Sequence, residues 1–246
     1  MTVGLVLEGG GMRGLYTAGV LNAFLEAGIK VDGIVAVSSG ALFEVNYLSD
    51  QKGRALRYNK RFIKDKNYMG LRSWIRTGNV VNKDMAYYKI PMELDKFDQA
   101  AFARSGVPFY VVATDIETGK ADYIKIDNVF DQLEAFRASS ALPLASEIVT
   151  YQDKHYLDGG LSDSIPVTFA QGSDFDKLIV ILTQSLDYRK KPSSGKLYKL
   201  LYKKYPDFVA VASKRYQHYN ERVEKIIQLE ENFPDVFNIW GESPDP

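Results

Sequence analysis

The sequence predicts an α/β fold in which a mostly parallel central sheet carries helices on both faces, giving three layers. Short apolar, β-prone runs recur along the 246 residues and are separated by helical stretches. Turns of glycine and other small residues directly follow several of these runs, and no Pro/Ser/Gly-rich linker divides the chain. We therefore expect one domain, with strands at residues 3–7, 34–37, 109–114 and 178–183.

The first strand leads into a glycine-rich turn, which consists of Gly9, Gly10, Gly11, Met12, Arg13 and Gly14. Residues 15–27 then carry an apolar stripe, which predicts a helix that Gly28 closes. Successive glycines leave backbone N–H groups unshielded at a helix N-terminus, where they favour an anion. The turn is thus suited to a phosphate or to the oxyanion of an acyl-transfer intermediate.

The same turn also has the spacing of a dinucleotide-binding loop, Gly-x-Gly-x-x-Gly after a strand. Such a loop needs an acidic residue at the end of the second strand. Ser38 stands there instead, whereas Asp32 precedes the strand and would lie at the wrong edge of the sheet. No Gly-Lys-Ser or Gly-Lys-Thr follows the glycines either, so nucleotide binding is the less favoured interpretation.

A sharp turn is predicted around Ser38, between the second strand and a helix that begins at Ser39. Small residues two positions before and after the serine, Ala36 and Gly40, let strand and helix pack closely while the hydroxyl points outward. This is the Gly-x-Ser-x-Gly elbow of serine hydrolases, with Ala36 in place of the first glycine, which is tolerable if its φ is below zero. The alternative is that Ser38 only caps the helix.

Asp158 follows a strand end at residues 155–157 and precedes Gly159 and Gly160. Paired glycines let the carboxylate and its backbone approach another turn closely. An aspartate of ordinary pKa, about 3.9, is a weak base for a serine hydroxyl, so close geometry in a partly dry site must do much of the work. An ordinary β-turn is the alternative for Asp-Gly-Gly taken alone.

The order and spacing of these motifs resemble the patatin-like phospholipases, a family of lipid acyl hydrolases with a Ser-Asp dyad. The Ala-Ser-rich stretch 138–143 and the run 158–167 resemble further segments of the family, the latter of its bacterial type. The resemblance implies that Ser38 is the nucleophile and Asp158 the base, that residues 9–14 form the oxyanion hole and that Ala36 and Gly40 form the elbow. It also implies a phospholipid or another fatty-acyl ester as substrate.

The resemblance covers about residues 3–185 and implies a patatin-like arrangement of the sheet. Residues 1–246 then form a single domain with a core at 3–185, a C-terminal helical extension at 186–240 and a frayed tail at 241–246. Two places depart from the family's pattern: the alanine at position 36, and Asp163-Ser164, where plant-type members more often carry an asparagine.

Histidine chemistry is the natural alternative, although the chain has only His155 and His218. Ser38, Asp158 and His218 follow the Ser-Asp-His order of α/β-hydrolases. However, residues 215–222 predict an exposed helical face, and a nucleophile at position 38 leaves room for only one earlier strand. We therefore expect His218 to be solvated and His155 to line a strand or the rim of a pocket.

Composition limits the other classes of function. The chain has no cysteine, only two histidines and no calcium-loop spacing, so we expect no metal and no cofactor. No secretory signal precedes the first strand and no apolar run approaches ~18 residues, which predicts a soluble, cytoplasmic protein. The 31 basic and 31 acidic residues give zero net charge, so no overall field attracts nucleic acid.

Residues 189–206 form an uneven region of charge, with seven basic and no acidic side chains among leucines and tyrosines. A basic, aromatic, partly helical stretch of this kind is suited to transient, peripheral contact with an anionic membrane surface. The alternative is a solvated helix whose leucines face the core.

Residues 51–105 form a second basic, aromatic stretch, placed directly after the helix of the nucleophile. We expect a cap over an acyl pocket, with a lining drawn from Tyr58, Phe62, Tyr68, Met69, Leu71 and Trp74. The alternative is a set of helices packed on the sheet.

The sequence thus favours a serine esterase of the lipase or phospholipase type that acts on a lipid substrate. The competing class is a non-catalytic module that binds phosphate or anionic lipid, in which the turn at residues 9–14 holds the anion and Ser38 only caps a helix.

Overall fold

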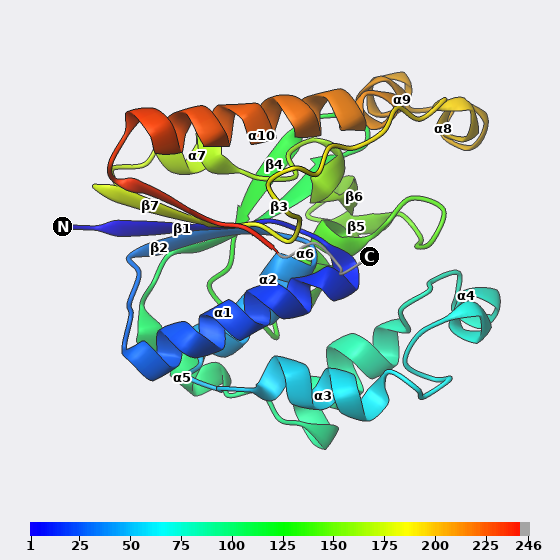
Figure 1. The fold of residues 1–246 in the computed structure, drawn as a ribbon. Helices are drawn as coiled ribbons and strands as arrows, with labels where there is room; N and C mark the ends of the chain where they lie inside the picture. Colours follow the sequence, from blue (N-terminus) through cyan, green and yellow to red (C-terminus); the bar gives the residue numbers. More distant parts are fainter. Residues whose placement is uncertain (242–246) are drawn as a thin grey trace.

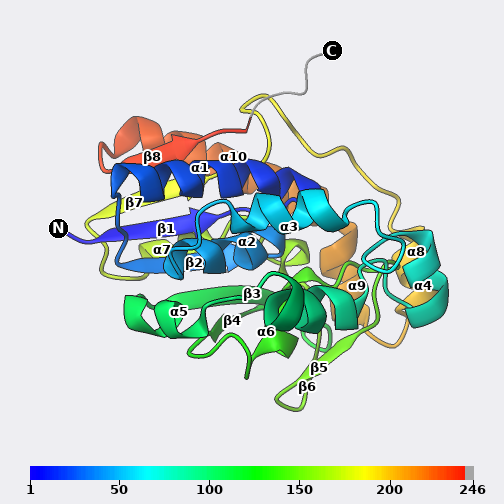
Figure 2. The same cartoon turned by 90° about the horizontal axis from the view of Figure 1, so that it is seen from below.

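The computed structural model describes residues 1–241, which form one eight-stranded sheet between two layers of helices (Figures 1 and 2). Along the sheet the strands follow the order β5-β6-β3-β2-β1-β7-β8, and β4 also pairs with β3. The pairs β3–β2, β2–β1, β1–β7 and β7–β8 are parallel. The strands are β1 (Val3–Leu7), β2 (Gly33–Val37), β3 (Phe109–Asp115), β4 (Ala121–Lys125), β5 (Val149–Tyr151), β6 (Lys154–Asp158), β7 (Lys177–Ile181) and β8 (Val236–Ile239).

Ten α-helices are present within residues 1–241, and they confirm the predicted three-layer α/β fold. The helices α1, α2, α5 and α6 lie on one side of the sheet, and α7 and α10 on the other (Figure 1). The helices are α1 (Gly14–Ala27), α2 (Ser39–Leu48), α3 (Arg54–Phe62), α4 (Leu71–Thr77), α5 (Gln99–Ser105), α6 (Leu133–Ser140), α7 (Val167–Gln171), α8 (Lys196–Leu201), α9 (Pro206–Ser213) and α10 (Arg215–Asn232).

Alternation along β1, an interior strand, explains why both faces of the sheet are covered. Leu5 and Leu7 of β1 belong to the core beneath α1 and α2, whereas Val6 belongs to the core beneath α7 and α10. Successive side chains of a strand point to opposite faces, so a strand that is apolar throughout needs a helical layer on each side. The short apolar runs of the sequence therefore predict buried parallel strands correctly.

The sheet is not parallel throughout, because β4 and β6 both run antiparallel to β3, and β5 runs antiparallel to β6. In the registers, Val37 of β2 lies opposite Val112, and Ala113 lies opposite Asp158 of β6. Ser38, one residue beyond Val37, is therefore level with Asp158 across β3. Two strand spacings separate the two backbones by about 9.5 Å, a distance that two inward-pointing side chains can bridge.

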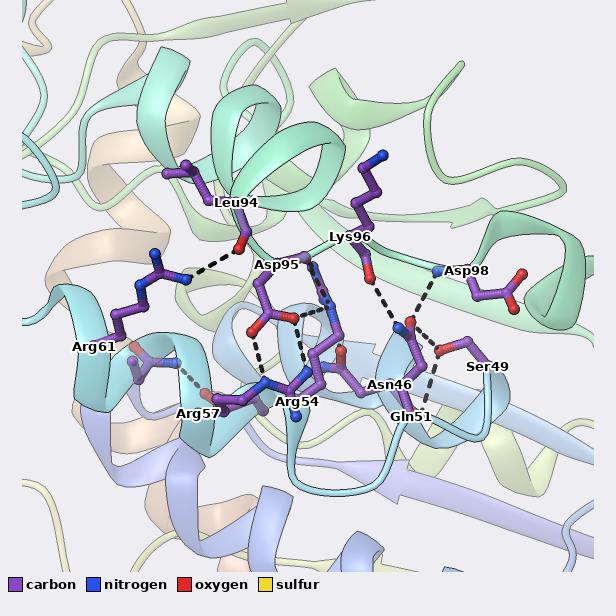
Figure 3. Close-up of polar contacts among 12 residues, drawn as sticks. Asn46, Ser49, Gln51, Arg54, Arg57, Arg61, Leu94, Asp95, Lys96 and Asp98 are labelled. Atoms are coloured by element: carbon purple, nitrogen blue, oxygen red, sulfur yellow. Dashed lines mark hydrogen bonds and ion pairs between the residues drawn. The ribbon is translucent and has the colours of Figure 1, made fainter.

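The segment 51–105 packs beside the sheet's helices through a buried arginine, Arg54, at the start of α3 (Figure 3). Its Nη1 donates to Asn46 Oδ1 of α2 (2.8 Å), and its Nε lies 3.3 Å from Asp95 Oδ1. Asp95 also accepts from Arg57 Nε at 2.8 Å. Both charges of the Arg54–Asp95 pair are almost fully buried. Together with the contact to Asn46, the pair joins the segment to α2.

The C-terminal extension contains more than the predicted helices. After α8, α9 and α10 the chain returns to the sheet as β8, which pairs with β7 in parallel. Asp163 lies against α10, where Arg222 Nη2 is 3.3 Å from its Oδ1 and Tyr123 donates to its Oδ2 at 2.8 Å. The extension is therefore part of the three-layer fold. Of the predicted tail at 241–246, only Gly241 lies within the described residues.

Removal of the Asp95 carboxylate leaves the buried Arg54 guanidinium without its counter-ion. Because breaking a buried ion pair from one side costs about 3–5 kcal/mol, we expect Asp95→Ala to lower the free energy of unfolding by about that amount. Urea unfolding measures the change. The matched control is Asp127→Ala, which removes a solvent-exposed pair with Lys125 and should change stability little; equal losses in the two variants would contradict the role given to Asp95.

Candidate active site

Ser38 occupies the sharp turn between β2 and α2. Its backbone has φ 54° and ψ −121°, a conformation that non-glycine residues adopt at a cost of order 1–3 kcal/mol. Its side chain makes no capping hydrogen bond within the described chain; instead Oγ donates to Asp158 Oδ2 at 2.8 Å. The residue is 8% exposed. The hydroxyl is therefore held by a carboxylate and not by the helix, unlike the capping alternative.

The structure explains separately why Gly40 and Ala36, on either side of Ser38, are small. A Cβ on Gly40 would lie 2.8 Å from the carbonyl oxygen of Glu8, so only glycine lets α2 approach the end of β1 this closely. Ala36 lies in β2 with φ below zero and is completely buried. The alanine therefore fits the strand without strain, and the replacement of the usual glycine leaves the turn intact.

Asp158 ends β6 and is 2% exposed. Its Oδ1 accepts from the Gly160 N–H at 2.7 Å, and its carbonyl oxygen accepts from Thr114 Oγ1 at 2.8 Å. A Cβ on Gly159 would lie only 2.1 Å from the carbonyl oxygen of Val112, so this glycine allows the turn to sit against β3. Burial raises the pKa of Asp158, while Arg215 and the Ser38 hydrogen bond lower it. The carboxyl group is therefore a stronger base than an exposed aspartate.

Two further serines hold the turns in place, and neither was predicted as a site residue. Ser139, completely buried in α6, accepts from the Ser38 N–H through its Oγ at 2.9 Å. Ser39 Oγ accepts from the Gly10 N–H at 2.9 Å. Ser139 belongs to the Ala-Ser-rich stretch noted in the sequence, but a contact across 101 residues leaves no local signal.

The glycine-rich turn forms a short 3₁₀ segment, Gly11–Arg13, before α1. Gly11 has φ 57°, in the left-handed region that favours glycine. The Gly10 N–H donates to Ser39 Oγ, and the Arg13 N–H donates to the Gly10 carbonyl. Gly11 and Met12 line the same cavity as Ser38, so their N–H groups are the donors of this turn that lie beside the cavity.

The other residues of the turn have structural contacts. The Gly9 carbonyl accepts from Thr183 Oγ1 at 3.2 Å, and Gly14 is buried at the start of α1. Arg13 is exposed, and its guanidinium donates to the side-chain oxygen of Gln184 at 3.2 Å once that amide is oriented to satisfy both groups. Arg13 thus steadies the turn from outside the cavity.

A cavity of about 310 Å³ adjoins Ser38, and most of its lining is apolar. It lies between the turns, α2, α6 and the segment 54–97, so the predicted cap over a pocket is present. Tyr58, Tyr68 and Met69 line it as expected. The volume is within the range of small-molecule sites.

Three of the residues expected in the lining lie elsewhere. Phe62 is buried behind the cavity wall, in a cluster with Tyr58 and Tyr68. Leu71 and Trp74 are 69% and 44% exposed, because Gly70, with φ 117°, turns the chain outward into α4. The prediction that this aromatic segment lines the cavity is therefore correct for residues before α4, whereas α4 itself faces away from the cavity.

The C-terminal extension adds a cation to the site, which the sequence motifs did not indicate. Arg215, the first residue of α10, donates from Nε to the carbonyl oxygen of Gly160 at 2.8 Å. Lys190 lies close by, with its Nζ 3.0 Å from the centre of the Tyr219 ring. Burial and the nearby Arg215 lower the pKa of Lys190 to about 7. Neither cation lines the cavity, so the positive charge near Asp158 lies outside the apolar lining.

The histidines lie where the sequence analysis expected them. His218 is on the exposed face of α10, and His155 lies in β6, with Nδ1 3.8 Å from Glu117 Oε1. Neither lines the cavity beside Ser38. Within residues 1–241, no three His, Asp or Glu side chains gather closely enough to hold a metal ion.

Fold and site together define an α/β protein whose serine and aspartate meet at the edge of an apolar cavity. The family model described as patatin-like phospholipase matches residues 5–170. The chain belongs to this family, as its motifs suggested.

The relatives differ greatly in length from this chain. The uncharacterized protein YjjU of Escherichia coli (strain K12) is 32% identical over 187 residues, which cover 74% of this chain and 52% of YjjU. The lysophospholipase nte1 of Aspergillus niger is 27% identical over 197 residues, covering 76% of this chain and 12% of that protein. The crystal structure of VipD from Legionella pneumophila aligns with a TM-score of 0.41 and 15% identity, covering 81% of this chain and 53% of VipD. The chain spans about half of YjjU and a small part of the fungal protein.

A further buried carboxyl group lies on α2, the helix that follows Ser38. Glu44 of α2 is completely buried, and among the described residues neither of its oxygens has a hydrogen-bond partner. Burial raises the pKa of Glu44 well above its usual value. The folded protein therefore holds this side chain in its neutral form over a range of pH in which the unfolded chain ionises it.

A raised folded pKa means that the stabilising effect of the bound proton is complete below the unfolded pKa, about 4.3, and is lost as pH rises through the folded value. We therefore expect the free energy of unfolding to decline as pH rises from about 4.3 to the pKa of Glu44 in the folded protein. Glu44→Gln, which cannot ionise, should flatten the decline relative to the parent protein. Chemical unfolding at a series of pH values measures it; identical slopes for both proteins would contradict the assignment.

Proposed function

We propose that the protein is a serine acyl hydrolase in which Ser38 and Asp158 act as a catalytic dyad. The observation that carries the proposal is the 2.8 Å hydrogen bond from Ser38 Oγ to Asp158 Oδ2, at a buried turn beside an apolar cavity. Membership of the patatin-like phospholipase family supports the same conclusion, since it points to a lipid hydrolase.

The reaction has two stages. In the first, Asp158 accepts the Ser38 proton as Oγ attacks the ester carbonyl, and the proton then passes to the alcohol that leaves. The acyl group remains on Ser38 as an ester. In the second stage Asp158 takes a proton from water as the water oxygen attacks the acyl carbonyl. The bond to Ser38 Oγ then breaks, the acyl group leaves as the fatty acid, and the proton passes from Asp158 to Ser38 Oγ.

The oxyanion of each tetrahedral intermediate needs donors on the cavity side of Ser38. The N–H groups of Gly11 and Met12 are suited to this, because both residues line the cavity together with Ser38. Gly9, Gly10 and Gly14 support the turn through close packing, and Ser39 fixes the Gly10 N–H. Ala36 and Gly40 provide the elbow.

The apolar cavity suits a fatty-acyl chain, and the substrate class that we propose is a phospholipid, a lysophospholipid or a related lipid ester. The lysophospholipase name of the fungal relatives favours this class. Within residues 1–241, no helix has the length and apolar character needed to cross a bilayer. We propose a cytoplasmic location with peripheral contact to membranes.

The dyad predicts a specific pattern of activity loss. We expect Ser38→Ala to abolish both labelling by a fluorophosphonate and turnover of a short-chain ester, since the nucleophile is gone. Asp158→Ala should lower turnover by at least about a hundredfold, the scale of a lost general base. His218→Ala is the matched control and should keep full activity.

Peptide mass mapping of the fluorophosphonate adduct identifies the reacting serine. An adduct at Ser38 supports the dyad, whereas retained turnover in Asp158→Ala would contradict it. Loss in all three variants would instead indicate a Ser-Asp-His triad. A binding module in place of an enzyme would show no turnover and would bind anionic lipid equally well after Ser38→Ala.

Arg215 should set the pH at which the dyad works. Only ionised Asp158 accepts the Ser38 proton, so kcat/KM falls as pH drops through the pKa of this group. Because Arg215 lowers that pKa, Arg215→Gln should move the acidic limb of the profile to higher pH, and Arg215→Lys should largely restore it. An unchanged limb with lower overall turnover would mean that Arg215 has a structural role only.

A further inference from the structure

Two short helices at the end of the molecule that carries the catalytic turns expose leucines, a tryptophan and lysines in place of a polar surface. We infer that α4, α8 and the segment 142–147 between them form a docking surface for an anionic phospholipid bilayer. This inference rests on the proposed function, since it supplies the surface from which the cavity would receive a lipid.

The helix α8 exposes its leucines to solvent. Leu197, Leu200 and Leu201 are 51%, 69% and 57% exposed, and no residue of α8 is buried. The helix is anchored instead by the next residue, Tyr202, whose buried ring packs against Phe208. The alternative in which these leucines face the core is therefore wrong, and their exposure requires another explanation.

The helix α4 repeats this arrangement from a distant part of the sequence. Leu71 and Ile75 are 69% and 71% exposed and Trp74 is 44% exposed, while only Ser73 of this helix is buried. Tryptophan at the edge of such a patch suits the boundary between lipid head groups and acyl chains. Both helices project from the same end of the molecule, to the right in Figures 1 and 2.

The segment 142–147 connects the two helices into one surface. The Leu144 N–H donates to the Tyr202 hydroxyl beside α8 (3.2 Å), and the Ala145 carbonyl accepts from the Val80 N–H beside α4 (2.7 Å). Leu142 and Leu144 add two half-exposed apolar side chains between the helices. Leu142 and Ala145 also line the cavity beside Ser38, so the surface borders the cavity.

The positive charge of this surface indicates an anionic partner. Six exposed cations accompany the apolar side chains: Arg72, Arg76, Lys196, Lys199, Lys203 and Lys204. Among residues 1–241 none of the six has a carboxylate within ion-pair distance. The connecting segment has one acidic residue, Glu147, whose carboxylate accepts a hydrogen bond from Asn79. Exposed apolar groups with a surrounding of unpaired cations match an anionic membrane, in which acyl chains lie beneath phosphate.

Vesicle sedimentation tests the inference with Ser38→Ala protein, so that the lipid is not consumed. We expect binding to vesicles of phosphatidylcholine mixed with phosphatidylglycerol, and much weaker binding to phosphatidylcholine alone. The double variant Leu200→Glu, Leu201→Glu should weaken binding at least about tenfold. Lys199→Gln with Lys203→Gln should weaken it about fivefold for each lysine and reduce its salt dependence.

The matched control is Phe233→Glu, an aromatic side chain that is 54% exposed at the far end of α10, and it should leave vesicle binding unchanged. The same substitutions in protein that retains Ser38 should leave turnover of a short-chain soluble ester unchanged, which also shows that the variants fold. Turnover of the vesicle lipid should fall in step with binding.

The inference would be overturned by equal binding to charged and uncharged vesicles, by equal losses in the control and the α8 variant, or by no binding at all. A dimer in buffer that the leucine variant dissociates would assign the surface to a second copy and would also overturn it. In each case, turnover of the soluble ester that depends on Ser38 would leave the proposed function standing, so the two failures are distinguishable.

Discussion

The hydrogen bond between Ser38 and Asp158 depends on the register of three strands. β3 is the common neighbour: Val112 lies opposite the last residue of β2, and the adjoining Ala113 lies opposite Asp158. A shift of either pairing by one residue would turn Ser38 or Asp158 to the other face of the sheet. The apolar alternation that buries both faces thus also fixes the two side chains at one level, so core packing and the geometry of the site are specified together. The strained Ser38 backbone persists because distant segments hold it, with Ser139 accepting from its N–H and Asp158 from its hydroxyl.

The site has two sides of opposite character. The cavity side is apolar and is bordered by Gly11 and Met12, whereas Arg215 and Lys190, from the C-terminal part of the chain, lie outside the cavity lining. A buried carboxylate is costly in apolar surroundings, and these cations offset part of that cost without occupying the apolar cavity. This division lets one aspartate remain ionisable while the adjoining space remains apolar.

Local sequence patterns predicted the central strands, the elbow at Ser38 and the turn at Asp158, because glycine spacing and short apolar runs reflect backbone geometry within a few residues. They did not predict that β6 is antiparallel, that α4 faces outward, or that Ser139 and Arg215 contact the turns at Ser38 and Asp158. The antiparallel pairing of β6 and the contacts of Ser139 and Arg215 join residues far apart in the chain, whereas α4 turns outward at Gly70, whose φ is 117°. Asp163 illustrates the difference: it is a departure from a motif in the sequence, but in the structure it is the partner of Arg222 on α10.

The position of β7 and β8 bears on how the family region behaves by itself. The matched residues end at 170, before β7, yet β7 pairs with β1 and β8 pairs with β7. A polypeptide that stopped at that boundary would leave the N–H and C=O groups of β1 unpaired along an apolar edge. Such an edge can pair with a strand of another molecule, which leads to aggregation. β7 therefore covers the edge of β1, and β8 covers the edge of β7, although both strands lie beyond every motif.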